Sequence, residues 1–156
     1  MIEIMNKFGY FGVLFLIAIE NIFPPIPSEV ILTYGGFMTQ RPTSTLEISG
    51  VIFFATIGSL IGALILYYIG KLLNKETLIK IISSKSGKLL CLKPRDIEKA
   101  NEWFENQGNK TVFFCRFIPI LRSLISIPAG MSNMKFSKFL FYTIVGSIGW
   151  NAILVI

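Results

Sequence analysis

The sequence lacks histidine altogether and contains only two cysteines. Without histidine, Ser-His catalysis, histidine metal sites and histidine-based phosphoryl transfer are excluded or strained. Cys91 and Cys115 are 24 residues apart and form no metal-binding motif, so we expect two free thiols rather than a disulfide framework. A glycine-rich phosphate loop is also absent, which argues against an ATP-driven pump. We therefore expect neither a metal nor another cofactor.

Charged residues are scarce as well. They make up 15% of the chain, against roughly 25% in an average soluble domain, while 53% of the residues are hydrophobic and the mean hydropathy is +0.64. Residues 50–70 and 139–156 carry no charge, and each stretch is long enough for a helix to cross a hydrocarbon core of about 30 Å. The sequence therefore predicts an all-α polytopic membrane protein. Because the second stretch ends while still apolar, we expect the native chain to continue past Ile156.

The net charge of +6 is unevenly distributed. Residues 71–110 hold nine Lys or Arg against five Asp or Glu, and the positive-inside rule predicts that this connector faces the cytoplasm. Its interspersed acids and apolar flanks favour this interpretation over a nucleic-acid-binding patch. Pro94 and the acids after it predict a helix start, and Gly108 predicts its end. The pattern favours an amphipathic helix on the cytoplasmic membrane face over a partner-binding helix.

Prolines interrupt the first apolar stretch. Residues 8–19 span only about 18 Å as a helix, too little for a clean crossing, before Glu20 and three prolines follow. The simplest interpretation is a re-entrant hairpin that enters the membrane, bends at the prolines and returns to a turn at Gly36 on the same side. The prolines of this predicted bend are Pro24, Pro25 and Pro27.

A similar interruption returns in the second half. Pro119 breaks an apolar stretch 11 residues before a predicted turn at Gly130, much as Pro24 stands 12 residues before Gly36. Each half thus has a broken hairpin, a glycine turn, a short loop and a crossing helix, and a cytoplasmic connector would give the halves opposite topology. We therefore predict one membrane domain, residues 1–156, with inverted repeats at 1–70 and 111–156 joined by the connector 71–110.

Four ionisable residues lie inside these interrupted stretches: Glu20 and Glu29 in the first, Arg116 and Arg122 in the second. Each charge at a bilayer centre costs roughly 2.5–3.5 kcal/mol, so four unpaired charges would oppose insertion by about 10–14 kcal/mol. The acids are interpreted as a protonatable pair lining a cavity, rather than as partners of backbone N–H groups freed by the prolines. A guanidinium stays charged and binds carboxylate or phosphate oxygens in pairs, so the arginines predict an anion site. The alternative is that they pair only with the two acids.

Two further features concern helix packing. Gly58 and Gly62 form a small-xxx-small pattern, which predicts tight packing against either the other half of the chain or a second copy in a homo-oligomer. Trp150 and Asn151 in the last span are candidates for lining the site, and packing or contact with lipid is an equally good interpretation of the tryptophan.

An ordered set of motifs covers nearly the whole chain: an acid on each side of a proline bend, an Arg-Phe-x-Pro-x-x-Arg element, a Gly-Met turn, and spaced glycines with a tryptophan in the last span. On these residues the chain resembles the DedA family of bacterial inner-membrane proteins, also called the SNARE-associated or VTT-domain family. The residues are Glu20, Glu29, 114–119, Arg122, Ala129, Gly130, Met131, Met134, Phe139, Gly146, Gly149 and Trp150.

The resemblance implies two facing re-entrant helices and, instead of an enzymatic activity, the movement of lipid phosphates across the bacterial cytoplasmic membrane. Undecaprenyl phosphate is associated with some members, and phosphatidylethanolamine transport or lipid scrambling with others. By this resemblance Arg116 and Arg122 would be phosphate headgroup ligands, and Glu20 and Glu29 would be proton-coupling acids. Many members have a Pro-Gly-Asp element near the second acid, whereas this chain has Pro-Ser-Glu ending at Glu29.

We therefore predict a transporter or flippase that moves a lipid phosphate, best matched by undecaprenyl phosphate, by alternating access and with proton coupling. Its expected partners are that lipid and the proton gradient, and no nucleic acid. Other classes stay open: a phospholipid translocase or scramblase, a proton-coupled cation or drug antiporter, and a membrane scaffold whose polar residues only hold the hairpins together. An intramembrane hydrolase is the least favoured class, because no nucleophile and base pair is evident.

Overall fold

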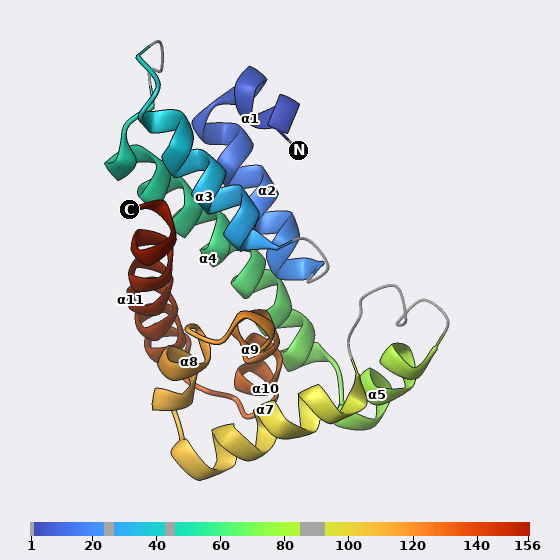
Figure 1. Ribbon diagram of the computed structural model, residues 1–156. Coiled ribbons are helices and arrows are strands. Elements are labelled where there is room, and N and C mark those ends of the chain that lie inside the picture. Colours follow the sequence, from blue (N-terminus) through green and yellow to red (C-terminus); the bar gives the residue numbers. More distant parts are fainter. Residues whose placement is uncertain (1, 24–26, 43–45, 85–92) are drawn as a thin grey trace.

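The computed structural model describes residues 2–23, 27–42, 46–84 and 93–156, and every regular element within these ranges is an α-helix (Figure 1). The prolines Pro24 and Pro25 and the thiol of Cys91 lie outside the described residues. In chain order the helices are α1 (Ile2–Phe8), α2 (Tyr10–Ile22), α3 (Ser28–Thr39), α4 (Ile48–Leu72), α5 (Lys75–Ser83), α7 (Pro94–Gln107), α8 (Lys110–Cys115), α9 (Pro119–Leu124), α10 (Ser126–Met131) and α11 (Phe136–Val155).

Two of the described helices, α4 and α11, are long and apolar enough to cross a membrane. The predicted charge-free stretch 50–70 is extended by two residues at each end in α4, which at 25 residues is about 38 Å long. The second predicted stretch begins three residues earlier than expected, at Phe136. Large apolar side chains on the outer surface of the molecule, such as Phe53 and Ile153, are more than half exposed, as a hydrocarbon solvent permits. The prediction of an all-helical chain with two candidate membrane spans is confirmed.

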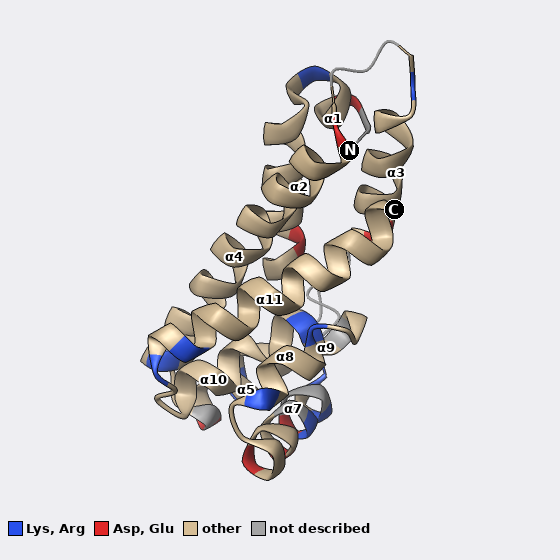
Figure 2. Cartoon of the chain, turned by 90° about the vertical axis from the view of Figure 1, so that its left-hand side faces the viewer, with Lys and Arg blue, Asp and Glu red and all other residues tan. Residues whose placement is uncertain are grey.

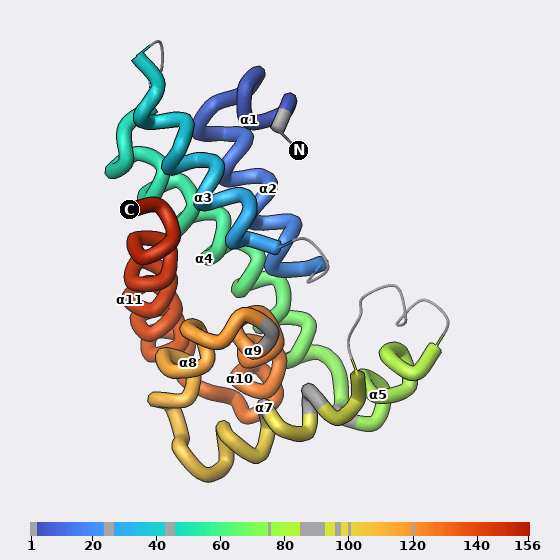
Figure 3. The backbone as a smooth tube through the Cα atoms, viewed as in Figure 1, coloured from blue at the N-terminus to red at the C-terminus, as the bar shows by residue number. Residues whose placement is uncertain are grey.

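The other helices are arranged around α4 in two groups (Figure 1). In the smooth trace, α2 runs down along the first half of α4 and α3 returns beside it, whereas α8, α9 and α10 gather around the other half (Figure 3). Helix α11 runs antiparallel to α4 and packs against α3, α4 and α8, so it connects the two groups. The end of α2 and the start of α3 therefore lie part-way along α4, on the side where the second group begins (Figure 1).

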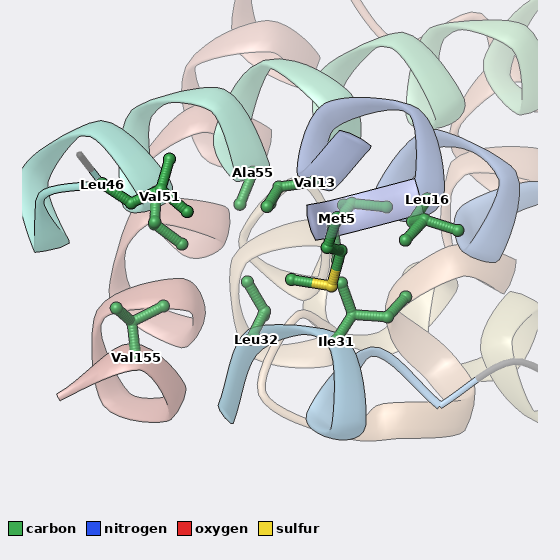
Figure 4. Packing of buried hydrophobic residues seen from close by; sticks show 10 residues of the cluster. Met5, Val13, Leu16, Ile31, Leu32, Leu46, Val51, Ala55 and Val155 are labelled. Atoms are coloured by element: carbon green, nitrogen blue, oxygen red, sulfur yellow. The ribbon is translucent and has the colours of Figure 1, made fainter. Parts of the chain in front are cut away.

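Each group has its own hydrophobic core. The first core joins residues from α1, α2, α3, α4 and the end of α11, and Figure 4 shows Met5 reaching between Val13 and Ile31 at its centre. The second core lies where α4, α7, α8, α10 and α11 meet, and the third joins α4, α5, α9 and α10, so the second group has two cores. The described residues thus form three separate cores instead of one that joins the two groups, and polar side chains lie where the groups meet.

Glycines are the closest contact points between helices, and two of them correct a prediction. Gly36 and Gly130 were expected at turns, but both are helical, in α3 and α10. A side chain at Gly36 would meet the backbone of Val155, and one at Gly130 would meet the backbone carbonyl of Tyr67. Small residues of this kind let membrane helices approach closely. The turn after α10 falls instead at Asn133, whose φ of 52° is positive.

The small-xxx-small pattern on α4 also has its partner within the chain. A side chain at Gly58 would meet the backbone of Leu14, and one at Gly62 would meet Asn21, both on α2. Both glycines are buried by this contact. The predicted tight packing is therefore present, but its partner is α2 from the same half of the chain instead of the other half, and this contact lends no support to a homo-oligomer through these glycines.

The amphipathic connector helix begins and ends where the sequence predicts. Helix α7 starts at Pro94, and Gly108 follows its last residue with a φ of 64°, the left-handed conformation that favours glycine after a helix. Phe104 is buried in the second core, and the hydroxyl of Thr111 donates to the backbone carbonyl of Trp103 at 2.8 Å. Part of the apolar face of α7 thus packs on the protein itself. The location of α7 at a membrane face stays a prediction.

Tyr67 closes the contact between α4 and the start of α11. Its hydroxyl donates to the backbone carbonyl of Met134 at 2.7 Å, and its ring stacks on Phe139 at 4.6 Å between centroids. We expect Tyr67→Phe to lower the free energy of unfolding by about 1–2 kcal/mol, because a buried carbonyl loses its donor. Thermal unfolding in detergent would measure this. The neighbouring Tyr68→Phe is the control, since Tyr68 is half exposed, and equal effects of the two changes would contradict the prediction.

Candidate functional site

Charged residues gather towards the two ends of the molecule, and few lie along the middle of the bundle (Figure 2). Three of those that are buried, Glu20, Arg116 and Arg122, belong to the interrupted segments. Glu20 lies in the last turn of α2, Arg116 follows the end of α8, and Arg122 lies in α9. The backbone breaks between elements thus bring ionisable groups to the region where the two helix groups meet.

Pro119 creates the break between the two arginines. It is the first residue of α9, a position that suits proline because no helical N–H bond is needed there. Ile118 before it is extended, with φ −110° and ψ 116°, as steric contact with proline requires. Arg116 and Arg122 therefore lie on separate short helices, as the sequence predicted for a bend at this proline.

Arg122 links α9 to α2 and α3 of the first group and to α4. Its Nη1 donates to Ser28 Oγ at 3.0 Å and its Nη2 to Ser59 Oγ at 3.4 Å. The same Nη2 lies 3.6 Å from Oε2 of Glu20. At that distance the ion pair is not a hydrogen bond, and the carboxylate oxygen has no hydrogen-bond donor among the described residues. The pair neutralises charge but leaves both groups with unused bonding capacity.

Arg116 has a separate set of partners from the second half of the chain. Its Nη2 lies 3.5 Å from Ser126 Oγ and 3.3 Å from Thr143 Oγ1. Among the described residues, neither its Nε nor its Nη1 has a hydrogen-bond acceptor, although the side chain is only 1% exposed. A β-carbon at Gly146 would lie 2.9 Å from Cβ and Cγ of Arg116, so this glycine gives the arginine its space. No carboxylate of the described residues forms an ion pair with Arg116.

Glu20 and Glu29, which the sequence suggested as a pair, have different surroundings. Glu20 is 5% exposed and faces Arg122, whereas Glu29 is partly exposed and forms no ion pair with any described residue. Glu29 lies in the first turn of α3, where a negative charge is favoured by the helix dipole. Pro27, the last of the predicted bend prolines, is the extended residue before that helix.

The two candidate lining residues lie further along α11. Asn151 is fully buried and its Nδ2 donates to Thr56 Oγ1 at 3.2 Å. Trp150 is partly buried and packs beside the first core, and its indole N–H has no acceptor among the described residues. Among the described residues, neither Trp150 nor Asn151 forms a hydrogen bond with an arginine side chain.

Sequence reasoning missed the hydroxyl groups that hold the arginines. Ser28 and Ser59 bind Arg122, and Ser126 and Thr143 bind Arg116. The available signal was the presence of hydroxyl residues inside otherwise apolar helices. A serine or threonine in a membrane helix can bond to its own backbone, however, so the sequence could not show that these four face a cation.

The arrangement is suited to binding an anion. Buried polar atoms are usually hydrogen-bonded, yet three guanidinium nitrogens of the two arginines, Nε and Nη1 of Arg116 and Nε of Arg122, have no acceptor in the described part of the chain. Among the described residues one buried carboxylate, Glu20, pairs with Arg122 and none pairs with Arg116, so positive charge is in excess. Phosphate oxygens accept several such bonds at once, which makes a phosphate group a good chemical match.

The chain is similar to known membrane proteins. The VTT domain family model matches residues 26–156. An alkaline phosphatase-like protein of Lactococcus lactis subsp. lactis (strain IL1403) is 61% identical over 155 residues, which cover 99% of this chain and 72% of that protein. Undecaprenyl phosphate transporter A of Staphylococcus aureus (strain NCTC 8325 / PS 47) is 44% identical, covering 96% of this chain and 72% of that protein.

A second protein with that name, from Bacillus subtilis (strain 168), is 36% identical, covering 97% of this chain and 71% of that protein. No solved structure matches the chain. The family model covers most of the sequence, and its range includes α3, the connector and both arginines. The chain therefore belongs to the VTT-domain family of membrane proteins, the DedA family that its motifs indicate.

Proposed function

We propose that this protein carries a lipid phosphate, with undecaprenyl phosphate as the best candidate, across the bacterial cytoplasmic membrane without chemically changing it. The observation that carries this proposal is the burial of Arg116 and Arg122, with exposed fractions of 1% and 2%, around unused guanidinium donors. Two cations buried in a membrane protein are costly unless they bind anions, and one carboxylate does not satisfy both. The names of the relatives from Staphylococcus aureus and Bacillus subtilis support the same substrate class.

The proposed mechanism is a competition for Arg122. In the empty state, Glu20 pairs with Arg122 at 3.6 Å and reduces the cost of burying both charges. A phosphate that enters must displace the carboxylate, because both bind the same guanidinium group. Protonation of Glu20 removes its negative charge and frees Arg122, so proton uptake favours phosphate binding and proton release favours phosphate departure. Transport is thereby coupled to the proton gradient.

Arg116 supplies the second headgroup contact in this proposal, and Glu29 is a second, weaker coupling acid. Arg116 is bound by hydroxyl groups alone within the described residues, so a phosphate can add to its coordination without displacing a carboxylate. Glu29 lies at the start of α3, nine residues after Glu20 in the chain. It is better placed to attract protons to the site than to compete for an arginine.

The topology completes the proposal. We infer that α2 with α3, and α8 with α9 and α10, are re-entrant hairpins that enter from opposite sides and meet near the middle of the membrane. Residues 1–70 and 111–156 would then be inverted repeats within one domain, and the basic connector 71–110 would face the cytoplasm. The positions of the two groups along opposite halves of α4 support this arrangement (Figure 1). The broken helices would bring the arginines to the depth at which a transporter needs its site.

Reconstitution into liposomes tests the function directly. We expect the protein to move undecaprenyl phosphate between leaflets, measured by its accessibility to a phosphatase added outside, and an imposed pH gradient to change the rate. Empty liposomes give the background rate. Parallel measurements of phosphatidylethanolamine and of a lipophilic cation test the phospholipid translocase and antiporter alternatives. Failure to move any lipid phosphate above background would overturn the proposal, and a protein that moves nothing would leave a scaffold role.

Hydrolysis is the alternative suggested by the name of the relative from Lactococcus lactis. The sequence has no histidine, and the described residues contain no group of three or more side chains that could hold a metal ion. The same liposomes test this alternative without the added phosphatase. Release of inorganic phosphate from undecaprenyl phosphate by the protein alone would favour the hydrolase over the carrier.

Glu20→Gln tests the coupling. The amide keeps the size of the side chain but carries no negative charge to pair with Arg122 and cannot take up or release a proton, so we expect transport to lose its response to an imposed pH gradient. Glu29→Gln is the matched control, because Glu29 is partly exposed and has no ion pair with a described residue, and we expect it to keep most of the response. A normal response in Glu20→Gln would contradict the competition mechanism while leaving lipid transport itself intact.

A further inference from the structure

A row of polar side chains follows one face of α11. Thr143, Ser147 and Asn151 are spaced four residues apart, which places them above one another on a helix. All three are buried, with exposed fractions of 0%, 2% and 0%. The rest of this helix is largely apolar, and side chains on its opposite face, such as Ile153, are exposed. A continuous polar face in the interior of a membrane bundle calls for a partner.

The row starts at the arginine site and leads away from it. Thr143 accepts a hydrogen bond from Arg116, and Asn151, two turns further, donates to Thr56 of α4. Four residues after Asn151, Val155 packs against Gly36 of α3. The row therefore extends from the second helix group towards the first, along the interface of α4 and α11 (Figure 1).

Several polar atoms along the row are unused. Ser147 Oγ and Asn151 Oδ1 have no hydrogen-bond partner among the described residues, and neither does Nε1 of Trp150 beside them. Orphaned buried polar atoms are rare in native proteins, and water or a ligand usually satisfies them. Three such atoms on two adjacent turns, beginning one turn after the Thr143 that binds Arg116, indicate a path for a polar group rather than one isolated defect.

An apolar groove lies alongside the row, between the same two helices. It has a volume of about 470 Å³ and is lined mainly by hydrocarbon side chains from α4 and α11, including Ile52, Ile57 and Ile148. Thr56 lines this groove and also accepts the hydrogen bond from Asn151. The polar row and the apolar groove are thus neighbours that share one residue.

We propose that the interface of α4 and α11 is the path of the lipid phosphate beyond the arginines: its phosphate group moves along Thr143, Ser147 and Asn151 while its hydrocarbon chain stays in the groove. This inference rests on the proposed function and extends it to a route. A lipid phosphate needs donors for its oxygens and an apolar surface for its chain, and this interface offers both side by side. Bulk membrane lipid in the groove would leave the buried polar atoms unpaired, whereas a lipid with a small polar group satisfies both surfaces with one molecule.

Cysteine accessibility tests the route. In a protein with Cys91→Ser and Cys115→Ala, single changes Ser147→Cys and Asn151→Cys are treated with a small, anionic, water-soluble methanethiosulfonate and followed by mass spectrometry. Val145→Cys and Ile153→Cys are the matched controls, since each lies two residues away at nearly the same depth on an exposed face of α11. Because the reagent needs a hydrated thiolate, we expect the two buried positions to react roughly tenfold faster than the controls.

Protection identifies the occupant. We expect undecaprenyl phosphate to slow the reaction at Ser147→Cys and Asn151→Cys several-fold and undecaprenol, the same chain without phosphate, to leave it unchanged. Buried cysteines that react no faster than the controls would overturn the path. If the cysteines react but undecaprenyl phosphate does not slow the reaction, the interface is a water channel and not a lipid path. If undecaprenol protects them equally well, the interface binds the hydrocarbon chain alone and the proposed phosphate path is wrong. Transport by the cysteine-free parent is measured in parallel, so a parent that transports while the cysteines fail refutes only this inference, and a parent that does not transport refutes the proposed function.

Discussion

Arg122→Lys is expected to reduce lipid-phosphate transport by roughly 30-fold, although lysine keeps the positive charge. Arg122 reaches Ser28 and Ser59 with two different nitrogens and lies beside Glu20, so it holds groups from three helices at once. A single ammonium cannot reproduce this planar fork. Losing one hydrogen bond to a charged group costs about 1.5–3 kcal/mol, and about 2 kcal/mol corresponds to a roughly 30-fold change in binding or rate. Initial transport rates in liposomes would measure the effect.

Two comparisons make this result specific. Arg95→Lys changes an exposed arginine of α7 and is expected to transport normally. Arg116→Lys is expected to impair transport as well, because Arg116 contributes the larger number of unused donors. Melting temperatures in detergent separate a loss of transport from a loss of folding. Normal transport by both buried variants would show that the arginines do not bind the phosphate group and would leave them a structural role.

Gly130→Ala is expected to cause the largest loss of stability from a single methyl group. A β-carbon at this position would meet the backbone carbonyl of Tyr67 and lie 2.9 Å from the backbone nitrogen of Lys71, so α10 would have to move away from α4. Backbone atoms of a helix cannot relieve a clash by changing rotamer, as a side chain can. Overpacking of this kind costs about 1–3 kcal/mol and occasionally more. Thermal unfolding in detergent would measure the loss.

Gly149→Ala is the matched control for this change. Both glycines are helical, but the nearest atom to a new β-carbon at Gly149 is the ring tip of Phe117, at 3.2 Å, and a ring can rotate. Replacing a helical glycine with alanine also reduces the entropy of the unfolded chain, which favours folding by about 0.5–1 kcal/mol. We expect Gly149→Ala to be near neutral. Equal destabilisation by both changes would show that the contact of α10 with α4 is not rigid.

Local signals in the sequence were sufficient to locate α4 and α11 within two or three residues and to give both ends of α7. The charge-free stretches predicted α4 and α11, and Pro94 and Gly108 predicted both ends of α7, because capping chemistry acts within a few residues. The same local reasoning failed at Gly36 and Gly130. A glycine permits a turn but also permits close helix packing, and only the partner helix distinguishes these two uses.

The candidate site was only half predictable. Buried ionisable residues in apolar sequence identified Glu20, Arg116 and Arg122, since a charge retained against an insertion cost needs a reason. The sequence did not show that Glu20 pairs with Arg122 or that Glu29 forms no ion pair with the residues that the structure describes. Those differences depend on where each helix places its side chain, and residues 20 and 122 are far apart in the chain.

The sequence by itself therefore determined that this is a helical membrane protein with prolines that break two of its segments and charges that it must neutralise. These properties follow from the composition and the residue order within short stretches of the chain. Only the tertiary structure decided that Arg122 contacts α2, α3 and α4, that Arg116 is bound by hydroxyl groups, and that a polar face of α11 leads away from them. These features arise from contacts between distant segments, and glycine-mediated helix packing fixes which segments meet.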